Sequence, residues 1–175
     1  MAQSYLVYNS ADATTASAVK QPTGTAIRTM MQLAPNVPIK VFEWGCSFDG
    51  VSAATPGQVE LIDTGTVPAT VTTAFGVNDV QTYGDSNSPA NGAGTAGTPL
   101  GLGTSYSGFA TAATTEGSYT APTRTFDVQL IAPTNQFIHQ FPLGREPYIP
   151  AGHFLHVRMN FGTSVNAYCY VLFEF

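Results

Sequence analysis

Residues 153–175 read HFLHVRMNFGTSVNAYCYVLFEF, and this stretch decides the fold class. Every second residue from Leu155 to Phe161 is apolar and the residues between them are polar, which is the period-two pattern of a β-strand with one buried face. From Asn166 onward, apolar and aromatic side chains occupy both faces up to Glu174, which predicts a central strand covered on both sides. Two consecutive strands of this kind indicate a protein built from β-sheets.

Similar segments recur along the rest of the chain, rich in β-branched and aromatic residues and separated by Gly, Pro, Asn and Asp. That pattern is typical of an all-β sandwich or barrel, and no window has a convincing helical pattern. Alternation within one segment places four side chains on one face: Phe42, Trp44, Cys46 and Phe48. We expect nine strands, enough for two facing sheets: 4–9, 25–34, 38–48, 57–65, 69–75, 123–132, 135–143, 153–161 and 166–175.

The length of 175 residues suits a single domain with its own core. We interpret residues 1–24 as an N-terminal arm or a first strand, and residues 25–175 as one β-sandwich domain with an inserted loop at 84–118. Residues 86–115 contain no charged side chain and are rich in Gly, Ala, Ser and Thr. Such a long loop is either a contact surface between subunits or a surface insertion without a role.

Charged residues make up only 10% of the chain, against about 25% in an ordinary soluble domain. Charge is depleted where one protein buries against another. The composition therefore indicates either a low-charge β domain of the secreted kind or a subunit whose surface is largely covered by other proteins. We favour the covered subunit.

The formal net charge is −5, and the six basic residues are scattered singly along the chain. Binding to nucleic acid needs several basic groups on one face, so we expect no nucleic-acid partner. The first residues have neither the basic region nor the apolar region that make up a secretory signal. No apolar run approaches the roughly 20 residues that span a bilayer. We therefore expect no membrane partner and a protein made in the cytoplasm.

Motifs that carry chemistry are missing from the sequence. His153 and His156 lie three apart in an expected strand, so they point to opposite faces and are poorly placed to chelate one metal ion. The carboxylates form no recognisable pair, and neither a GxSxG motif nor a phosphate-binding GxxxxGK[ST] motif occurs. We expect no enzyme, no metal and no cofactor, with a hydrolase on a sandwich scaffold as the catalytic alternative.

The two cysteines, Cys46 and Cys169, lie far apart in the sequence within apolar, aromatic segments. Reduced core cysteines are the default in a cytoplasmic protein. A disulfide between them would require that their two strands be neighbours.

Four segments carry a resemblance to a known group of proteins: EWGCSFDG (43–50), PGQVELIDTGTVPATVTTAF (56–75), APTNQFIHQFPLGREP (132–147) and NAYCYVLFEF (166–175). Together and in this order they resemble segments of β-rich virion structural proteins of actinobacterial phages and prophages. The resemblance covers roughly residues 40–175, with the glycine-rich loop as its variable part. Because these segments have no known chemical role, they indicate relatedness better than function.

The resemblance implies a capsid decoration or minor capsid subunit with a jelly-roll-like antiparallel β-sandwich fold. It implies a homo-oligomer, a trimer on the head surface, with the major capsid protein or another virion protein as partner and the virion as location. The alternative function is a glycan-binding module of a tail fibre or spike, which exposed aromatic side chains beside Asn and Asp would support.

A subunit interface would cover aromatic side chains that a monomer leaves exposed, and apolar residues interrupt the glycine-rich loop. Arg145 and Glu146 are adjacent charges in a charge-poor chain, which form either a solvated turn pair or an ion pair between subunits. The residues expected to make self-association or shell contacts are Trp44, Leu100, Leu102, Tyr106, Phe109, Arg145, Glu146, Tyr148, Tyr168 and Tyr170.

Overall fold

The computed structural model describes residues 4–10, 21–51, 55–75, 79–83, 101–102, 106–109 and 121–175, and these contain strands and no helix. The strands are β1 (Ser4–Tyr8), β2 (Gln21–Pro22), β3 (Arg28–Leu33), β4 (Ile39–Phe48), β5 (Gly57–Asp63), β6 (Thr73–Ala74), β7 (Val80–Tyr83), β8 (Gly108–Phe109), β9 (Arg124–Ile131), β10 (Gln136–Gln140), β11 (Tyr148–Ile149), β12 (Leu155–Asn160) and β13 (Asn166–Glu174).

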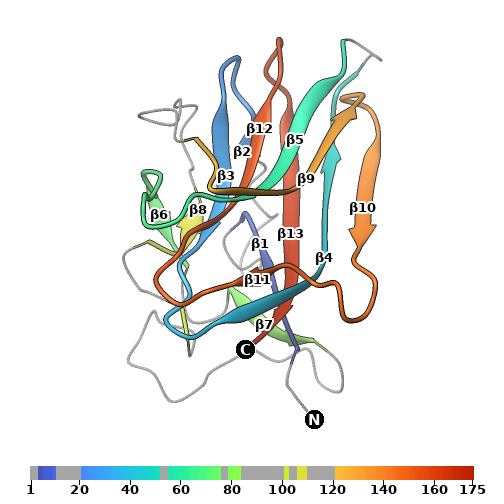
Figure 1. The fold of residues 1–175 in the computed structure, drawn as a ribbon. Helices are drawn as coiled ribbons and strands as arrows, with labels where there is room; N and C mark the ends of the chain where they lie inside the picture. Colours follow the sequence, from blue (N-terminus) through green and yellow to red (C-terminus); the bar gives the residue numbers. More distant parts are fainter. Residues whose placement is uncertain are drawn as a thin grey trace.

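Two antiparallel sheets pack face to face (Figure 1). The first sheet has the order β10-β4-β13-β1-β7, with β11 paired to β4 and β2 paired to β13. The second sheet has the order β6-β8-β3-β12-β5-β9. The eight main strands therefore interleave as β1-β13-β4-β10 and β3-β12-β5-β9, which is the double Greek key of a jelly roll. The expected jelly-roll-like sandwich is confirmed.

The core lies between the sheets and consists of inward-facing side chains from both. Strand β13 is central in the first sheet, between β4 and β1, as its sequence predicts. The expectation that both of its faces are covered was wrong, because its outer face at Tyr168 and Tyr170 is only half-buried. Each large side chain that is fully buried in such a core contributes about 1.5–3 kcal/mol. The core includes Val7, Val41, Trp44, Val171 and Phe173 from the first sheet and Met31, Val59, Leu61, Leu155, Val157 and Met159 from the second.

A β-bulge corrects one expected alternation. Along the pairing of β4 with β13, Leu172 lies opposite Glu43 and Phe173 lies opposite Val41, so Phe42 is an extra residue in β4. The alternation therefore shifts at this point, and the fully buried residue next to Trp44 on the core side is Val41. The prediction that Phe42 occupies this place was wrong, because a bulge cannot be recognised from alternation alone.

All nine expected strands are present, although the one expected at 69–75 is reduced to the two residues of β6. The short strands β2, β7, β8 and β11 were not predicted from the sequence. Within residues 1–24, β1 lies inside the first sheet between β13 and β7, so residues 4–8 form a strand of the sandwich. Most of the expected loop at 84–118 lies outside the described residues.

Candidate functional site

The outer face of the first sheet carries a set of tyrosines. In β13, Tyr168 and Tyr170 alternate with the buried Cys169 and Val171, so both tyrosines point away from the core. Their side chains are half-buried. We call this surface the tyrosine face, defined by Tyr8, Tyr83, Tyr148, Tyr168 and Tyr170.

The other three tyrosines reach the same face from neighbouring strands. Tyr8 follows the buried Val7 in β1 and lies opposite Tyr170, with ring centroids 5.9 Å apart. Tyr83 lies in β7 and Tyr148 in β11, next to the buried Ile149. The exposed fractions are 40% for Tyr8, 52% for Tyr83 and 48% for Tyr148, which is high for aromatic side chains.

The centre of the tyrosine face is tightly built. The ring of Tyr170 lies across Gly45, where an added Cβ would be 2.7 Å from the ring. The Tyr170 hydroxyl donates a hydrogen bond of 2.5 Å to Glu43. Burial raises the pKa of Tyr170, and the neighbouring Glu43 raises it further. Burial likewise raises the pKa of Tyr8, with a smaller effect of Tyr83. The hydroxyls therefore stay neutral and act as hydrogen-bonding groups.

Few charges accompany these tyrosines. Lys40 and Glu174 form an ion pair of 3.9 Å at the margin of the face. Glu146 accepts a hydrogen bond of 2.8 Å from the backbone N–H of Gly144. Hydrogen bonds from its own backbone N–H and from the backbone N–H of Gly144 lower the pKa of Glu146. Arg145 is exposed and Glu146 is half-buried, and the hydrogen bond from Gly144 to Glu146 places the pair within a turn.

Three other expected contact residues belong to the core instead. Trp44, Leu102 and Phe109 are completely or almost completely buried within the chain. The indole N–H of Trp44 donates to Asp127 at 3.1 Å. The expectation that a monomer leaves Trp44 exposed was wrong, because its ring points inward between the two sheets. Leu102 and Phe109 were expected to make contacts from the glycine-rich loop, and both belong to the core of the chain. They are therefore unable to contact a partner without rearrangement of the core.

The last two expected contact residues lie elsewhere. Tyr106 is about half exposed and packs edge-on against Phe154, with ring centroids 5.5 Å apart, so it lies away from the tyrosine face. Leu100 lies outside the described residues. Sequence reasoning missed Tyr8 and Tyr83. The alternation in the expected strand at 4–9 could have indicated Tyr8, whereas no strand was expected around Tyr83.

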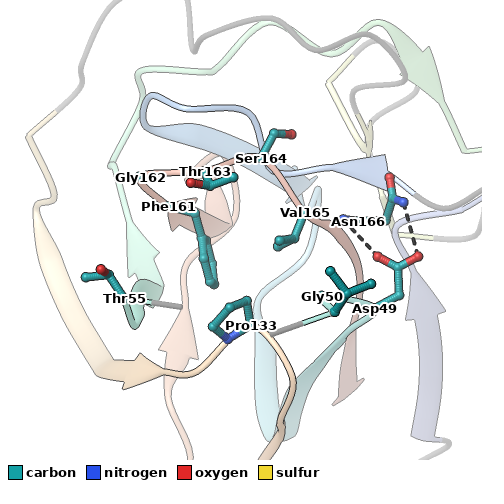
Figure 2. A pocket seen from close by; sticks show the side chains of 11 residues that line it. Asp49, Gly50, Thr55, Pro133, Phe161, Gly162, Thr163, Ser164, Val165 and Asn166 are labelled. Carbon is teal, nitrogen blue, oxygen red and sulfur yellow. Dashed lines mark hydrogen bonds between the residues drawn. The ribbon is translucent and has the colours of Figure 1, made fainter. Parts of the chain in front are cut away.

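A pocket of about 500 Å³ opens at one end of the sandwich (Figure 2). Three connections meet there: the segment after β4, the turn between β9 and β10, and the segment between β12 and β13. Nothing in the sequence indicated this pocket, because its residues come together only through the jelly-roll topology. It is lined by Asp49, Gly50, Val51, Thr55, Pro133, Phe161, Gly162, Thr163, Ser164, Val165 and Asn166.

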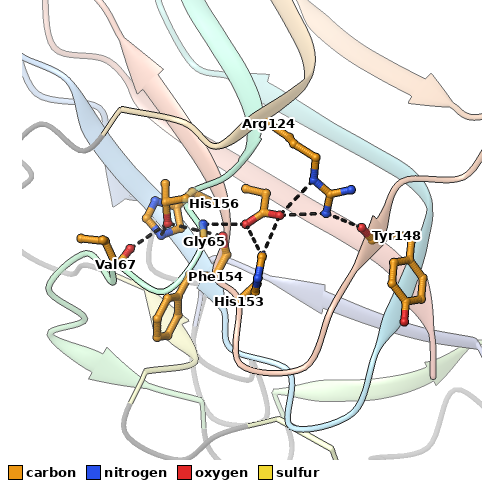
Figure 3. Close-up of polar contacts among 9 residues, drawn as sticks. Gly65, Val67, Arg124, Tyr148, His153, Phe154 and His156 are labelled. Atoms are coloured by element: carbon orange, nitrogen blue, oxygen red, sulfur yellow. Dashed lines mark hydrogen bonds and ion pairs between the residues drawn. The ribbon is translucent and has the colours of Figure 1, made fainter.

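A polar cluster ties strand ends of the second sheet together (Figure 3). The buried Asp63 accepts hydrogen bonds from Arg124 at 2.8 Å and from the backbone N–H of Gly65 at 2.7 Å, and it contacts His153 at 3.0 Å. Burial alone would raise the pKa of Asp63, but the hydrogen bonds from Arg124, Gly65 and His153 together lower it. The carboxylate is therefore ionised and saturated with donors, which suits a structural latch.

The outer face of the second sheet also carries a buried polar layer. Arg158 pairs with Glu60 at 2.8 Å. The two ring nitrogens of His156 lie 3.5 Å and 3.2 Å from the hydroxyls of Thr29 and Thr64. The outward-facing residues of β12 were expected to form a polar face. His156 and Arg158 of this face are buried among their partners, and Asn160 is exposed.

Metal and thiol chemistry find little support in the described residues. No group of three His, Cys, Asp or Glu side chains within them is placed to hold a metal ion. Cys46 and Cys169 are cross-strand neighbours in the first sheet, and both are free, buried thiols. Burial raises the pKa of Cys46 to about 12 and that of Cys169 well above its usual value. These thiols are therefore poor nucleophiles.

Among the described residues, no helix is long and apolar enough to cross a membrane. Comparisons with protein-family models, with curated proteins and with solved structures found no match. The functional interpretation therefore depends on the geometry of this chain.

Proposed function

We propose that this chain is a structural subunit of a phage particle, a capsid decoration or minor capsid protein. In this proposal it stabilises the head by associating with copies of itself, as a trimer, and with the major capsid protein. The observation that carries the proposal is the tyrosine face, a sheet surface with half-exposed rings and few charges. The jelly roll is also an architecture of viral capsid domains, and four sequence segments resemble phage structural proteins.

Tyrosine suits this purpose for a physical reason. Its ring supplies a large apolar contact area, and its hydroxyl remains hydrogen-bonded at the edge of an interface. Tyrosine is accordingly enriched in protein interfaces, whereas charged residues are depleted from their centres. The ring of Tyr170 is held in place by Gly45 and Glu43, so little conformational freedom is lost on binding.

Stabilisation of a shell requires no catalysis. A subunit that binds the assembled shell and not its separate parts stabilises the shell by mass action. Repeated weak contacts around a symmetric lattice then act together through avidity. The proposed location is therefore the virion, after synthesis in the host cytoplasm.

The experiment that tests self-association is gel filtration with light scattering at micromolar concentration. We expect the unmodified chain to be an oligomer and the Tyr8→Lys/Tyr83→Lys variant to be a folded monomer, because charges would have to be buried in the interface. The matched control is Val128→Lys/Leu130→Lys, which changes exposed apolar side chains of β9 in the other sheet. A monomeric unmodified chain, or an oligomer that only the control variant dissociates, would contradict the role of the tyrosine face.

The virion assignment needs a separate measurement. Mass spectrometry of purified phage particles from cells that carry the gene should detect the chain in a fixed ratio to the major capsid protein. If the chain instead stays in the lysate after the particles have been removed, it is no part of the particle.

A further inference from the structure

The two cysteines lie directly opposite each other on neighbouring strands. Cys46 in β4 pairs with Cys169 in β13, and the register is regular for two residues on either side of this pair. Directly opposed side chains lie on the same face of a sheet. Both cysteines are almost completely buried within the core cluster, so they share the core face of the first sheet. The two strands that a disulfide would join are therefore neighbours.

The backbone of Cys169 shows which kind of antiparallel pair the cysteines form. Opposed residues alternate between hydrogen-bonded and non-hydrogen-bonded pairs. The N–H of Cys169 donates to Oδ1 of Asn9 at 2.8 Å, and the carbonyl oxygen of Cys169 accepts from the N–H of Asn9 at 3.1 Å. Both backbone groups of Cys169 therefore point toward the segment that follows β1 and away from β4. Cys46 and Cys169 are a non-hydrogen-bonded pair.

A second contact farther along the same two segments leads to the same assignment. The N–H of Asp49 donates to the carbonyl oxygen of Asn166 at 3.2 Å, so these two residues form a hydrogen-bonded pair. They lie three positions from the cysteines, and an odd number of positions changes one kind of pair into the other.

A non-hydrogen-bonded pair has the spacing that a disulfide requires. Its Cα atoms are about 4.5 Å apart and its side chains are closer than in a hydrogen-bonded pair. Disulfides span Cα separations of about 4.4–6.8 Å. Burial raises the pKa of Cys169 and the thiol of Cys46 raises it further, so the two side chains are close enough to interact. Rotation of the two side chains can therefore form the bond without movement of the strands.

We propose that Cys46 and Cys169 form a disulfide inside the core when the chain meets an oxidising environment, and remain thiols in a reducing cytoplasm. With glutathione disulfide as the oxidant, one cysteine thiolate attacks a glutathione sulfur and releases the first glutathione. The second cysteine thiolate attacks the cysteine sulfur of this mixed disulfide and releases the other glutathione. The two cysteines lose two protons and two electrons, and glutathione disulfide gains them as it becomes two glutathione molecules.

Burial decides when this exchange takes place. Buried thiols with a raised pKa react slowly. The exchange therefore occurs while β4 and β13 are apart, during folding or a transient opening. Once the strands have closed, other thiols cannot reach the buried sulfur atoms, which protects the disulfide. This bond requires only the pairing of β4 with β13, so it is independent of the proposed function.

The redox equilibrium of the full chain with glutathione tests the proposed disulfide. Reduced and oxidised chains are incubated in mixtures of glutathione and glutathione disulfide, without denaturant and in concentrated urea, until both starting states give the same result. Mass spectrometry after alkylation of the remaining thiols measures the fraction of chain with an intramolecular disulfide. Peptide mapping then shows whether Cys46 and Cys169 are the linked residues.

The fold and the disulfide should stabilise each other, because the disulfide closes a long loop of the unfolded chain. We expect the equilibrium constant for disulfide formation to be at least about 30-fold larger in the folded chain than in urea. Equal equilibrium constants would overturn the proposal. So would a folded chain that stays a dithiol, carries only glutathione adducts or forms disulfides between chains.

The matched control moves one thiol to the other face of the same strand. In Cys46→Ala/Ser47→Cys, the new thiol lies opposite Tyr168 on the outer face, whereas Cys169 points into the core. We expect no intramolecular disulfide in this folded variant under conditions that oxidise the unmodified chain, and circular dichroism checks its fold. Equal oxidation of the two folded chains would show that strand register does not decide the bond, which contradicts the proposal.

Urea unfolding provides a second readout. The oxidised unmodified chain should unfold at a higher urea concentration than the reduced chain. Cys46→Ala should unfold at the same urea concentration with and without a reductant, because it cannot form the bond. A lower midpoint for the oxidised unmodified chain would mean that the disulfide distorts the sheet, and it would overturn the proposal.

Discussion

The outer faces of the two sheets start from the same alternating pattern and end differently. On the second sheet, the outward side chains of β12 are His156 and Arg158, which are buried and paired with Thr29, Thr64 and Glu60. On the first sheet, the outward side chains include five tyrosines, of which Tyr8, Tyr83 and Tyr148 are 40–52% exposed. The second sheet therefore satisfies the centre of its outer face within the chain, although Val128 and Leu130 stay exposed on its edge strand β9. The first sheet leaves the ring surface of its tyrosines open.

This difference shows where a partner would gain most. Burying a polar layer that already has its partners offers little free energy, whereas covering exposed rings removes apolar surface from water at about 25 cal/mol per Å². If the comparison is right, changes on the second sheet affect stability and changes at the periphery of the tyrosine face affect association.

The largest expected effect comes from breaking the buried ion pair of the second sheet. Arg158→Met leaves Glu60 charged and buried without its partner, which should lower the free energy of unfolding by about 3–5 kcal/mol. Urea unfolding at pH 7, followed by circular dichroism, measures it. The double variant Arg158→Met/Glu60→Leu should recover most of the loss, because well-packed apolar residues often replace a buried pair without cost.

The matched control lies on the first sheet. Lys40 pairs with Glu174, but the lysine side chain is 53% exposed. Lys40→Met should therefore change the free energy of unfolding by less than about 1 kcal/mol. Equal losses for Arg158→Met and Lys40→Met would mean that the two outer faces do not differ in the way described.

An intermediate effect is expected at the centre of the tyrosine face. Gly45→Ala would place a methyl group 2.7 Å from both the Phe137 carbonyl oxygen and the Tyr170 ring. Overpacking of this kind should lower the free energy of unfolding by about 1–3 kcal/mol. Gly162→Ala is the control, because its methyl group meets open space. Thermal unfolding that is unchanged in Gly45→Ala would show that the Tyr170 ring is loosely held.

The smallest expected effect depends on pH and concerns the latch at the end of the second sheet. The pKa of Asp63 is lower in the folded chain than its usual 3.8. Asp63 therefore contributes stability above that pH, and the contribution is lost as the pH falls through the lowered pKa. Asp63→Asn should lower the free energy of unfolding at pH 7 by about 1–2 kcal/mol, because the three donors lose their charged acceptor. The loss stays small because the side chains of Arg124 and His153 can reach water.

Urea unfolding at neutral and acidic pH measures this contribution. The unmodified chain should lose stability below about pH 4, and Asp63→Asn should lose less over the same range. If the free energy of unfolding depends on pH in the same way in both chains, Asp63 does not contribute to the loss of stability in acid. Asp49→Asn is a useful comparison, since Asp49 is an exposed acid at the opposite end of the sandwich.

Particular residues show how far sequence reasoning reached. Alternation identified β12 and β13 and placed Tyr168 and Tyr170 on the same face of β13, because side-chain direction in a strand depends only on local backbone geometry. It did not show that this face is only half-buried, since both faces of the strand were expected to be covered. The same reasoning failed at Phe42, where a bulge inserted one residue, and it misjudged Trp44, which looked like an interface aromatic but is a core residue. It could not find Tyr83, which lies in a four-residue strand without a recognisable pattern.

The sequence by itself determined the fold class, the main strands and the shortage of charge, since period-two patterning and composition are local properties of the chain. Only the tertiary structure decided which outer face is closed and which is open, because that depends on whether partners such as Glu60 for Arg158 come from a neighbouring strand. It also decided the pocket, where Asp49, Pro133 and Phe161 meet. Their positions in the sequence are far apart, and only the winding of the jelly roll brings their three connections to one end of the sandwich.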